Sequence, residues 1–593
     1  MSHTESLRIG MIDGSIEANS RRFHVVLDAD VVVQLDDLVA VAQVLPSGEE
    51  VVHYGIVVET TRHIEGARFA SDTIHIGEET MPGETARRIE VQVLRTDPEM
   101  WLSPDPGMVV RQARGADRDM ALFADQMQKP LAVGMDQSQQ PVHVDFEFVD
   151  GTRGAHVNIS GISGVATKTS YALFLLYMLL ETSDGQRLLG AHAANTRGII
   201  FNVKGEDLLF LDRPNSKLTD EHKLDWAALG VDNPGGFTDV KLYSPRAAAA
   251  TGNVVPDVRG RDRSSVTAYG WDPWTFVRMG LLRFLFTADD DRRTQVGFVE
   301  QQVRLQLARH AFPLEKSSTG TVVLVDSASD EIPYDFERII AATRDPVAAN
   351  AGTVIRDFGD ILSFLELKLI SQEDPTWTAN TQPSTVQAFM RRLFAMRRRV
   401  GHLISTGVET VDLDTARLSV VDISRLHQSA QRFVVGALLD AVWDSKQGTG
   451  REPLRLVVLD ELNKYAPREG YSPLKELLVD IAERGRALGV ILIGAQQAAT
   501  AIAPAIIRNA AVKVVGRLDA LEAGEYRFLT PELRERATRF LPGTMVVDQP
   551  LVPAPIPIRF PFPGFATNPD EGRLTAPEAG QLEDELIDRI VKR

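Results

Sequence analysis

Residues 157–170 read VNISGISGVATKTS, and this stretch decides how the chain is organised. A short apolar strand, 157–160, leads through a turn of small residues to Lys168 and Thr169, which open an apolar helix. A phosphate-binding loop requires this order of elements, because the backbone N–H groups at the start of a helix face the phosphate oxygens. The segment therefore predicts a nucleotide site on a sheet of alternating strands and helices.

The loop itself is irregular. The usual pattern is Gly, four residues, then Gly-Lys-Ser/Thr, but Thr167 and Ile162 stand where the glycines are expected. One extra residue brings Gly161 and Gly164 into place, yet the glycine before Lys168, which would allow positive φ and close approach to phosphate, is missing. An isolated match this irregular is more often an ordinary strand, turn and helix. The candidate phosphate-binding residues are Gly161, Ser163, Gly164, Val165, Ala166, Thr167, Lys168, Thr169 and Ser170.

A second stretch, LVVLDE at 456–461, supplies the other half of such a site. It has the pattern of a buried strand and ends in Asp460 and Glu461. In ATP hydrolysis one carboxylate serves the metal and the other orients the attacking water. Another strand pattern, 490–495, ends at Gln496, where a polar side chain can contact the γ-phosphate. An acidic pair alone is often only a strand end, and Gln496 alone a surface amide, but together these elements suggest an ATP-driven motor.

Composition limits the class of protein. With 593 residues the chain should divide into three or four domains, and its 44% apolar and 24% charged residues are ordinary for a globular protein. The chain has no cysteine, no secretory signal and no apolar run of about 18 residues, so we expect a cytoplasmic protein without a membrane span. The formal charge of −17 disfavours broad nucleic-acid coating, so DNA would need a local basic lining such as a pore.

The order of predicted elements divides the chain into five parts. Short strands and turns over residues 1–112 predict an N-terminal β-barrel or sandwich. Alternating strands and helices predict a parallel α/β sheet in two pieces, 113–211 and 415–548, whose apolar strands are buried on both faces. Amphipathic helical patterns between them predict an inserted helical subdomain at 212–414. The Pro-rich residues 549–593 should run extended along a surface and end in a tail helix.

The combination resembles the HerA family of hexameric DNA translocases, within the HerA/FtsK group of ATPases. Besides the loop at Lys168, the resemblance rests on IIFNVKGE (199–206), LDELNKYAP (459–467), GRALG (485–489), Gln496 and VGRL (515–518). It implies a RecA-like P-loop ATPase core with an N-terminal β-barrel and an inserted helical subdomain. It also implies a homo-hexameric ring around double-stranded DNA, with ATP and Mg²⁺ bound between neighbouring subunits.

The resemblance implies a role for each candidate residue. Lys168 matches the lysine that contacts the β- and γ-phosphates, and Thr169 and Asp460 match the magnesium ligands. Glu461 matches the general base and Gln496 the residue that senses the γ-phosphate.

Arg486 resembles the arginine finger that a subunit gives to its neighbour, with Arg484 as the second candidate. The family commonly works with a NurA-type nuclease, and relatives act beside effector proteins in antiphage defence. The resemblance thus implies an ATP-dependent translocase or helicase in end resection or defence.

Several points stay open in the sequence. Asn202 stands where relatives often have Asp, and with the irregular loop this points to weak ATPase activity. Arginines at 391–392 and 397–399 could line a DNA channel or simply face solvent, and Lys204 and Lys464 are alternative DNA contacts. One rival function is a nucleotide-binding ring scaffold with little turnover that organises an effector. Another is an ATPase that moves polypeptide or a conjugation complex.

Overall fold

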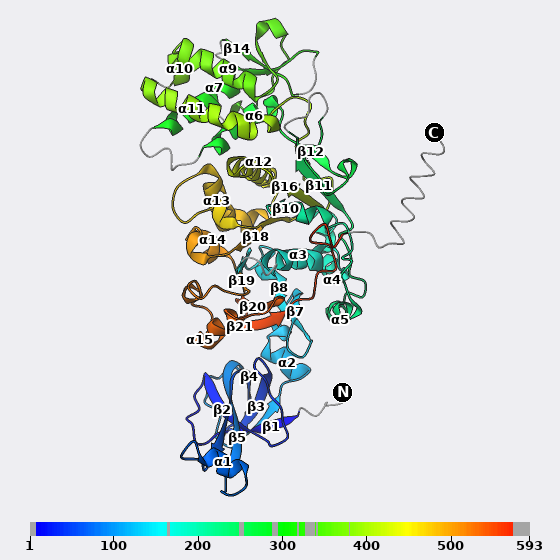
Figure 1. Cartoon of the computed structure of the whole chain (residues 1–593), viewed down its shortest axis with the longest axis vertical. Helices are drawn as coiled ribbons and strands as arrows, with labels where there is room; N and C mark the ends of the chain where they lie inside the picture. Colours follow the sequence, from blue (N-terminus) through cyan, green and yellow to red (C-terminus); the bar gives the residue numbers. More distant parts are fainter. Residues whose placement is uncertain are drawn as a thin grey trace, which may run out of the picture.

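The computed structural model describes residues 7–162, 167–247, 254–286, 295–316, 320–326, 338–339, 342–378 and 380–572. The molecule is elongated, with the N-terminal barrel at one end, the large sheet in the middle and the helices α7, α9, α10 and α11 at the other end (Figure 1). The predicted tail helix and loop residues 163–166 lie outside the described residues. No helix in the described part of the chain is both long and apolar enough to cross a membrane.

Six strands close into the N-terminal barrel, in the order β1-β2-β5-β4-β3-β6. Their bounds are β1 (Arg8–Ile12), β2 (Arg22–Leu27), β3 (Leu38–Val44), β4 (Glu50–Glu65), β5 (Glu84–Asp97) and β6 (Val109–Gln112). Side chains of alternate residues, such as Phe23 and Val25, or Val39 and Val41, form its own apolar core. The barrel prediction is confirmed, and a turn at 46–48 joins β3 to β4.

Twelve strands form the large sheet, of which eight are mutually parallel and lie in the order β12-β11-β16-β10-β17-β18-β9-β19. Six of these lie in the two predicted pieces of the sheet: β9 (Val157–Ser160), β10 (Arg197–Asn202), β16 (Leu418–Asp422), β17 (Arg455–Leu459), β18 (Val490–Gln496) and β19 (Val512–Val515). Antiparallel strands then extend the sheet: β20 (Thr544–Gln549), β21 (Val552–Arg559), β7 (Pro130–Met135) and β8 (Pro141–Asp145). The predicted mixed α/β fold with a parallel sheet is confirmed.

Helices cover both faces of the sheet. The helices of this part of the chain are α3 (Thr167–Leu180), α4 (Ser183–Leu189), α5 (Asp220–Ala228), α12 (Gln428–Lys446), α13 (Pro473–Leu488) and α14 (Pro504–Asn509). In β17, Leu456 and Val458 belong to the apolar cluster that contains α3, whereas Val457 and Leu459 belong to the cluster that contains α12 and α13. This alternation follows from the two-residue period of a strand, so each face of the sheet has its own core.

Residues 212–414 are less purely helical than predicted. The helices are α6 (Pro273–Arg278), α7 (Val296–His310), α9 (Phe358–Glu366), α10 (Pro375–Thr378) and α11 (Pro383–Val400). However, β11 (Val240–Pro245) and β12 (Thr267–Tyr269) join the large sheet, and β13 (Ala311–Pro313), β14 (Val322–Val325) and β15 (Gly352–Ile355) form a small sheet of their own. The pattern missed β11 because Lys241 interrupts its apolar residues, and it missed β12 because that strand has only three residues and begins at Thr267.

The Pro-rich segment was expected to stay on the surface, and this expectation was wrong for β21. Its prolines, Pro553, Pro555 and Pro557, stand at every second position, so their missing N–H groups all fall on one side of the strand. The residues between them remain free to pair with β20, while β21 pairs with β7 only at Arg559 and Met135. A strand with three prolines therefore fits inside the sheet.

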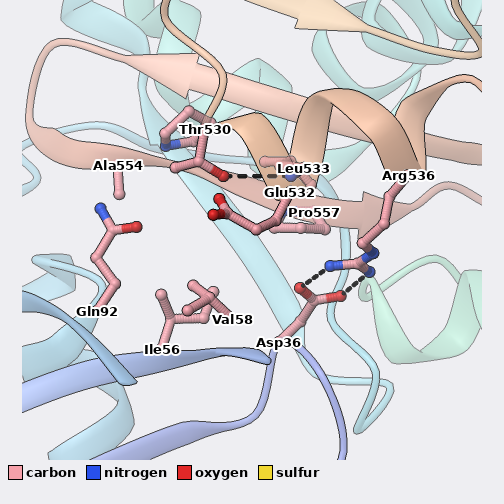
Figure 2. A pocket seen from close by; sticks show the side chains of 11 residues that line it. Asp36, Ile56, Val58, Gln92, Thr530, Glu532, Leu533, Arg536, Ala554 and Pro557 are labelled. Carbon is pink, nitrogen blue, oxygen red and sulfur yellow. Dashed lines mark hydrogen bonds and ion pairs between the residues drawn. The ribbon is translucent and has the colours of Figure 1, made fainter. Parts of the chain in front are cut away.

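The barrel is fixed to the rest of the molecule by polar and apolar contacts. Barrel residues such as Tyr54 and Ile56 belong to the same apolar cluster as α3, to which α2 (Ala116–Ala121) also contributes. On α15 (Pro531–Ala537), the guanidinium of Arg536 donates two hydrogen bonds to the carboxylate of Asp36, at 2.8 and 2.7 Å. Figure 2 shows this fork at the rim of a small cavity between the barrel and α15. A further short helix, α1 (Asp72–Gly77), belongs to the barrel segment.

Candidate nucleotide site

The candidate site lies at the carboxyl edge of the parallel sheet. β18 pairs with β9 on one side, where Gln496 lies opposite Ser160, and with β17 on the other, where Gly494 lies opposite Leu459. Because all three strands are parallel, the loop that follows β9 and the acidic pair that follows β17 emerge at the same edge. The fold therefore brings the two halves that the sequence singled out to one place.

The start of α3 is held firmly at this edge. All side chains from Tyr171 to Leu180 are buried, so the apolar stretch that follows the loop is a core helix. Aromatic residues of the C-terminal segment pack against it, with ring centroids 5.2 Å apart for Tyr171 and Phe560 and 5.6 Å apart for Tyr177 and Phe565. The N-terminal turn of α3, which carries Lys168 and Thr169, is therefore positioned by packing far from the loop.

A direct hydrogen bond joins the two halves of the site. Thr169 donates from Oγ1 to Oδ2 of Asp460 at 2.6 Å. The other carboxylate oxygen of Asp460, Oδ1, accepts the backbone N–H of Glu461 at 2.7 Å. A hydroxyl at the start of the helix and a carboxylate at the end of β17 are thus close enough to share one ligand.

Lys168 is a buried cation, and no carboxylate of the described residues is in contact with it. Its side chain is only 4% exposed, and its Nζ donates to the carbonyl oxygen of Gly161 at 2.6 Å. Burial lowers the pKa of Lys168 to about 8, against the opposing effect of Asp460. A buried ammonium that the protein only partly compensates is suited to an anion, because a phosphate would supply the missing negative charge.

Lys204, which was predicted only as an alternative DNA contact, is an ion-pair partner of Asp460. Its Nζ lies 2.8 Å from Oδ2 of Asp460, the same oxygen that accepts from Thr169. Burial alone would raise the pKa of Asp460, but the charge of Lys204 and the hydrogen bonds to it hold that pKa below its usual range. Asp460 is therefore an ionised carboxylate whose Oδ2 is paired with the ammonium of Lys204.

These residues fit a magnesium ion. Mg²⁺ prefers hard oxygen ligands and usually keeps several waters while binding one or two protein groups and nucleotide phosphates. The hydroxyl of Thr169 and Oδ2 of Asp460 provide such ligands side by side, and Lys204 shows that Oδ2 is accessible to a cation. An ion placed here would have to displace the ammonium of Lys204 from this oxygen.

Glu461 adopts an unusual backbone conformation. Its φ of 54° and ψ of 43° lie in the left-handed region, which is uncommon for a residue with a side chain. Its carboxylate pairs with Lys464, one turn along the chain. Strained backbone of this kind concentrates at functional sites, so the geometry agrees with a positioned carboxylate, although no contact here tests the role of a base.

Gln496 is fully buried at the end of β18, and its side chain is bonded to β9. Its Nε2 donates to Oδ1 of Asn158 at 2.6 Å and to Oγ of Ser160 at 2.8 Å, and its Oε1 accepts from Asn158 at 3.1 Å. The amide therefore connects the strand before the loop to the strand beside the acidic pair. Its role as a sensor stays a prediction.

The substitution at Asn202 has a local explanation. Asn202 lies opposite Asp422 in the pairing of β10 with β16, and its Nδ2 donates to Oδ1 of Asp422 at 3.1 Å. Burial raises the pKa of Asp422 to about 6. A second carboxylate at position 202 would face this acid, and like charges in a buried site are costly, whereas an amide donates a hydrogen bond.

Arg486 lies at the opposite, amino edge of the sheet. It is on the last turn of α13, and its guanidinium donates to the carbonyl oxygens of Gly151 at 3.1 Å and Thr152 at 2.7 Å, in the turn before β9. Arg484 stacks on the ring of Trp443, 5.6 Å from its centroid. Since β17 separates the two edges by about 15 Å, neither arginine can reach the site of its own chain.

The remaining candidate residues form the walls. The N–H of Gly161 donates to the carbonyl of Gln496 at 3.2 Å, which sets where the chain leaves β9. Ser170 and Thr169 line a cleft of about 580 Å³, including its open mouth, together with Lys204, Asp207 and Asp460. Ser163, Gly164, Val165 and Ala166 lie outside the described residues, and of Thr167 only its place at the first position of α3 is described.

Comparisons with known proteins found likeness only in solved structures. No protein-family profile matches the chain, and no curated protein matches it in sequence. The structure of VirB4 of Thermoanaerobacter pseudethanolicus is 14% identical, with a TM-score of 0.40, and the match covers 73% of this chain and 96% of VirB4.

Two further solved structures are similar to this chain. The plasmid coupling protein TrwB in complex with a non-hydrolysable ATP analogue is 12% identical, with a TM-score of 0.45, covering 77% of this chain and 94% of TrwB. The genome packaging NTPase B204 from Sulfolobus turreted icosahedral virus 2, in complex with AMPPCP, is 14% identical with a TM-score of 0.18, covering 22% of this chain and 63% of B204.

Proposed function

We propose that this protein is an ATPase that uses ATP and Mg²⁺ to move along double-stranded DNA, as a translocase or helicase of the HerA type. The observation that carries the proposal is the 2.6 Å hydrogen bond between Thr169 Oγ1 and Asp460 Oδ2, next to the buried ammonium of Lys168. It places a helix N-terminus, a lysine, a hydroxyl and a carboxylate at one edge of a parallel sheet. TrwB has been solved with an ATP analogue and with ADP and Mg²⁺, and these are the kinds of ligand that we propose for this site.

In this proposal each residue has one task. Lys168 and the backbone at the start of α3 bind the phosphates, while Thr169 and Asp460 hold Mg²⁺, which neutralises charge that develops on the transferred phosphoryl group. Glu461 accepts a proton from the attacking water, and Gln496 links the γ-phosphate side of the site to β9. Lys204 must leave Asp460 when the metal binds.

The site is completed by a second copy of the chain. Arg486 faces away from its own nucleotide, so we propose that it reaches the nucleotide of a neighbour in a ring of six subunits. To do so it must release the carbonyl oxygens of Gly151 and Thr152. The ring would enclose double-stranded DNA and act with a NurA-type nuclease or a defence effector, in end resection or antiphage defence.

ATP hydrolysis with and without DNA tests the proposal. We expect wild-type turnover to exceed that of Lys168→Ala and Glu461→Gln by about 100-fold or more, and to rise when duplex DNA is added. Glu461→Gln should still bind ATP, because it removes the base but none of the phosphate or metal ligands. Wild-type turnover no faster than that of both variants would refute the motor.

A nucleotide-binding scaffold remains the second candidate function. Lys168 is bonded to Gly161 and Lys204 occupies the metal-side oxygen of Asp460, so the site is closed by its own cations. The scaffold predicts tight nucleotide binding and a stable ring without turnover. Measuring nucleotide affinity, oligomer mass and hydrolysis on one preparation distinguishes the two functions. Stimulation of hydrolysis by DNA would separate the DNA motor from an ATPase that moves polypeptide.

A further inference from the structure

Helix α11 (Pro383–Val400) is strongly basic. Its 18 residues, PSTVQAFMRRLFAMRRRV, contain five arginines and no acidic residue, in a chain whose formal charge is −17. One side of the helix is buried through residues such as Phe389, Leu393 and Met396, which belong to the apolar cluster of the sheet. The arginines at 391, 397, 398 and 399 are exposed on the remaining surface.

Several exposed arginines of α11 have no carboxylate partner among the described residues. Arg283, Arg455 and Arg536 each pair with an aspartate. Within the described residues, no carboxylate lies within ion-pair distance of Arg391, Arg397 or Arg398. An acidic protein that leaves several guanidinium groups of one helix unpaired keeps a surface that attracts a polyanion.

The exposed face has the length and rigidity to follow a phosphate backbone. Arg391 and Arg398 are seven residues apart, which places them on the same side of the helix about 10 Å apart along its axis. Duplex DNA carries one phosphate per about 3.4 Å of axis on each strand, so this distance spans about three phosphates. Phe394, 39% exposed, lies between the two arginines on this face.

The same helix is connected through α12 to the residues that follow β17 at the candidate site. Arg399 donates to Oγ of Ser429 at 3.1 Å, in the first turn of α12. In the next turn, Arg432 donates to the carbonyl oxygen of Lys464 at 3.3 Å, and Lys464 pairs with Glu461. A ligand on α11 would therefore lie a few side-chain contacts from the candidate base. Figure 1 shows α11 and α12 adjacent in the half of the molecule away from the barrel.

We infer that the exposed face of α11 that carries Arg391 and Arg398 binds the phosphate backbone of double-stranded DNA. The inference deepens the proposed function and rests on it for the choice of DNA among polyanions. We expect the contact to be electrostatic and independent of base sequence, because contacts from arginine to phosphate carry no sequence information.

Binding of a labelled random-sequence duplex to the full chain, without nucleotide, tests the inference. Fluorescence anisotropy over a range of salt concentrations gives both the affinity and its salt dependence. We expect Arg391→Gln combined with Arg398→Gln to weaken binding by about tenfold or more at low salt. The slope of log affinity against log salt should become shallower by about 2, since two phosphate contacts are lost.

The matched control removes the same charge from the barrel. Arg62 and Arg68 are also exposed and, among the described residues, have no carboxylate partner, so Arg62→Gln combined with Arg68→Gln changes the net charge equally. Equal losses for the two double variants would overturn the inference, because net charge alone would then explain them. Arg391→Lys combined with Arg398→Lys keeps the charge and should restore most of the binding, which excludes misfolding as the cause.

Two further outcomes distinguish duplex binding by α11 from binding of unpaired bases and from the proposed ATPase function. Phe394→Ala should leave duplex affinity unchanged, and a large loss would overturn the assignment to duplex DNA, because it indicates stacking on unpaired bases. Because the assay contains no nucleotide, a chain that binds DNA through α11 but hydrolyses no ATP refutes the proposed function alone. A chain that hydrolyses ATP but binds DNA equally well without these arginines refutes this inference alone.

Discussion

The two edges of the parallel sheet treat buried polar groups in opposite ways. At the carboxyl edge, Lys168 and Asp422 are buried ionisable groups whose pKa values burial shifts to about 8 and about 6. At the amino edge, His156 is buried and neutral, with its pKa lowered by burial to about 4, and Arg486 is bonded to backbone carbonyls. One edge keeps charges that need a ligand, and the other holds a neutral imidazole and an arginine that is bonded within the chain.

This difference indicates that the carboxyl edge binds a charged ligand and that the amino edge has a structural role within one chain. A buried charge is costly, and it persists where function requires it, so the carboxyl edge is where a charged ligand is expected to restore the balance. The amino edge has no such need within one chain. If Arg486 is a catalytic group, it must therefore act on another subunit.

The largest effect is expected from variants that test whether Arg486 of one subunit acts at the nucleotide site of another. Arg486→Ala and Lys168→Ala should each lower hydrolysis, Arg486→Ala by about 1,000-fold, since an arginine finger neutralises charge in the transition state. When the two variants are mixed and reassembled, activity should recover in part, because some interfaces combine an intact Lys168 with an intact Arg486. Steady-state hydrolysis of mixed and unmixed samples measures this.

A purely structural role for Arg486 gives a different pattern. Its bonds to Gly151 and Thr152 hold the turn before β9, so Arg486→Ala would then lower the melting temperature and mixing would restore nothing. Arg484→Ala serves as the comparison, because it removes an equal charge from the same helix and breaks only the stacking on Trp443.

A second test addresses the cost of charge at the carboxyl edge. Asp422→Asn keeps an oxygen to accept from Asn202 and Ser424, and removes a buried charge whose Oδ2 has no hydrogen-bond partner among the described residues. We expect it to raise the free energy of unfolding at pH 7 by about 2 kcal/mol. The folded pKa lies above the unfolded one, so wild-type Asp422 adds stability below about pH 4 that is lost as pH rises through about 6.

The gain from Asp422→Asn should therefore shrink as the pH falls from 6 to 4. Thermal and denaturant unfolding at both pH values measures it. Asp440→Asn is the control, because burial also raises the pKa of Asp440 to about 6 but Asp440 pairs with Arg283. Removing it leaves that guanidinium unpaired, so a similar gain for both variants would contradict the explanation.

A third and smaller effect concerns the two lysines beside the acidic pair. Lys204 and Lys464 are 44% and 40% exposed, and each pairs with one member of the pair, Asp460 or Glu461. Lys204→Met should lower the Mg²⁺ concentration needed for half-maximal effect on nucleotide binding by about tenfold, or about 1.4 kcal/mol, because it removes a competing cation. Titration calorimetry with ADP at several Mg²⁺ concentrations tests this. Lys464→Met should change it little, and equal shifts would contradict the assignment.

The smallest effect is expected at the amino edge. The folded pKa of His156 is depressed, so its folded-state stability is retained above the unfolded pKa of 6.5 and declines as pH falls towards 4. Between pH 6.5 and 5.5, His156→Asn should lose about 1 kcal/mol less stability than the wild type. Asn tolerates the φ of 66° at this position. Parallel pH curves for the two proteins would mean that His156 is not buried neutral.

Much of the fold could be predicted because its strands have simple patterns. β10, β17 and β18 contain continuous apolar runs, which is typical of strands buried on both faces of a parallel sheet. β21 could not be predicted in the same way. Prolines argue against a paired strand, and only the register with β20 shows that their spacing leaves one side able to pair.

For the candidate site, the sequence motifs predicted which residues gather near one ligand, but they did not predict every pairing among those residues. Thr169 and Asp460 were expected near one ligand, and the structure brings them together. The pairing of Lys204 with Asp460 depends on β10 lying beside β17, which the separate sequence patterns do not specify. Likewise Asn202 looked like a defect until its partner Asp422 was known.

The packing of Phe560 and Phe565 against α3 has a consequence for synthesis of the protein. Lys168 emerges from the ribosome early, but the aromatic residues that seat its helix are made almost 400 residues later. Until then the nascent chain exposes an apolar helix that invites chaperones and aggregation. A message truncated before Phe560 should therefore yield a protein that lacks a competent nucleotide site, even though every candidate ligand has already been translated.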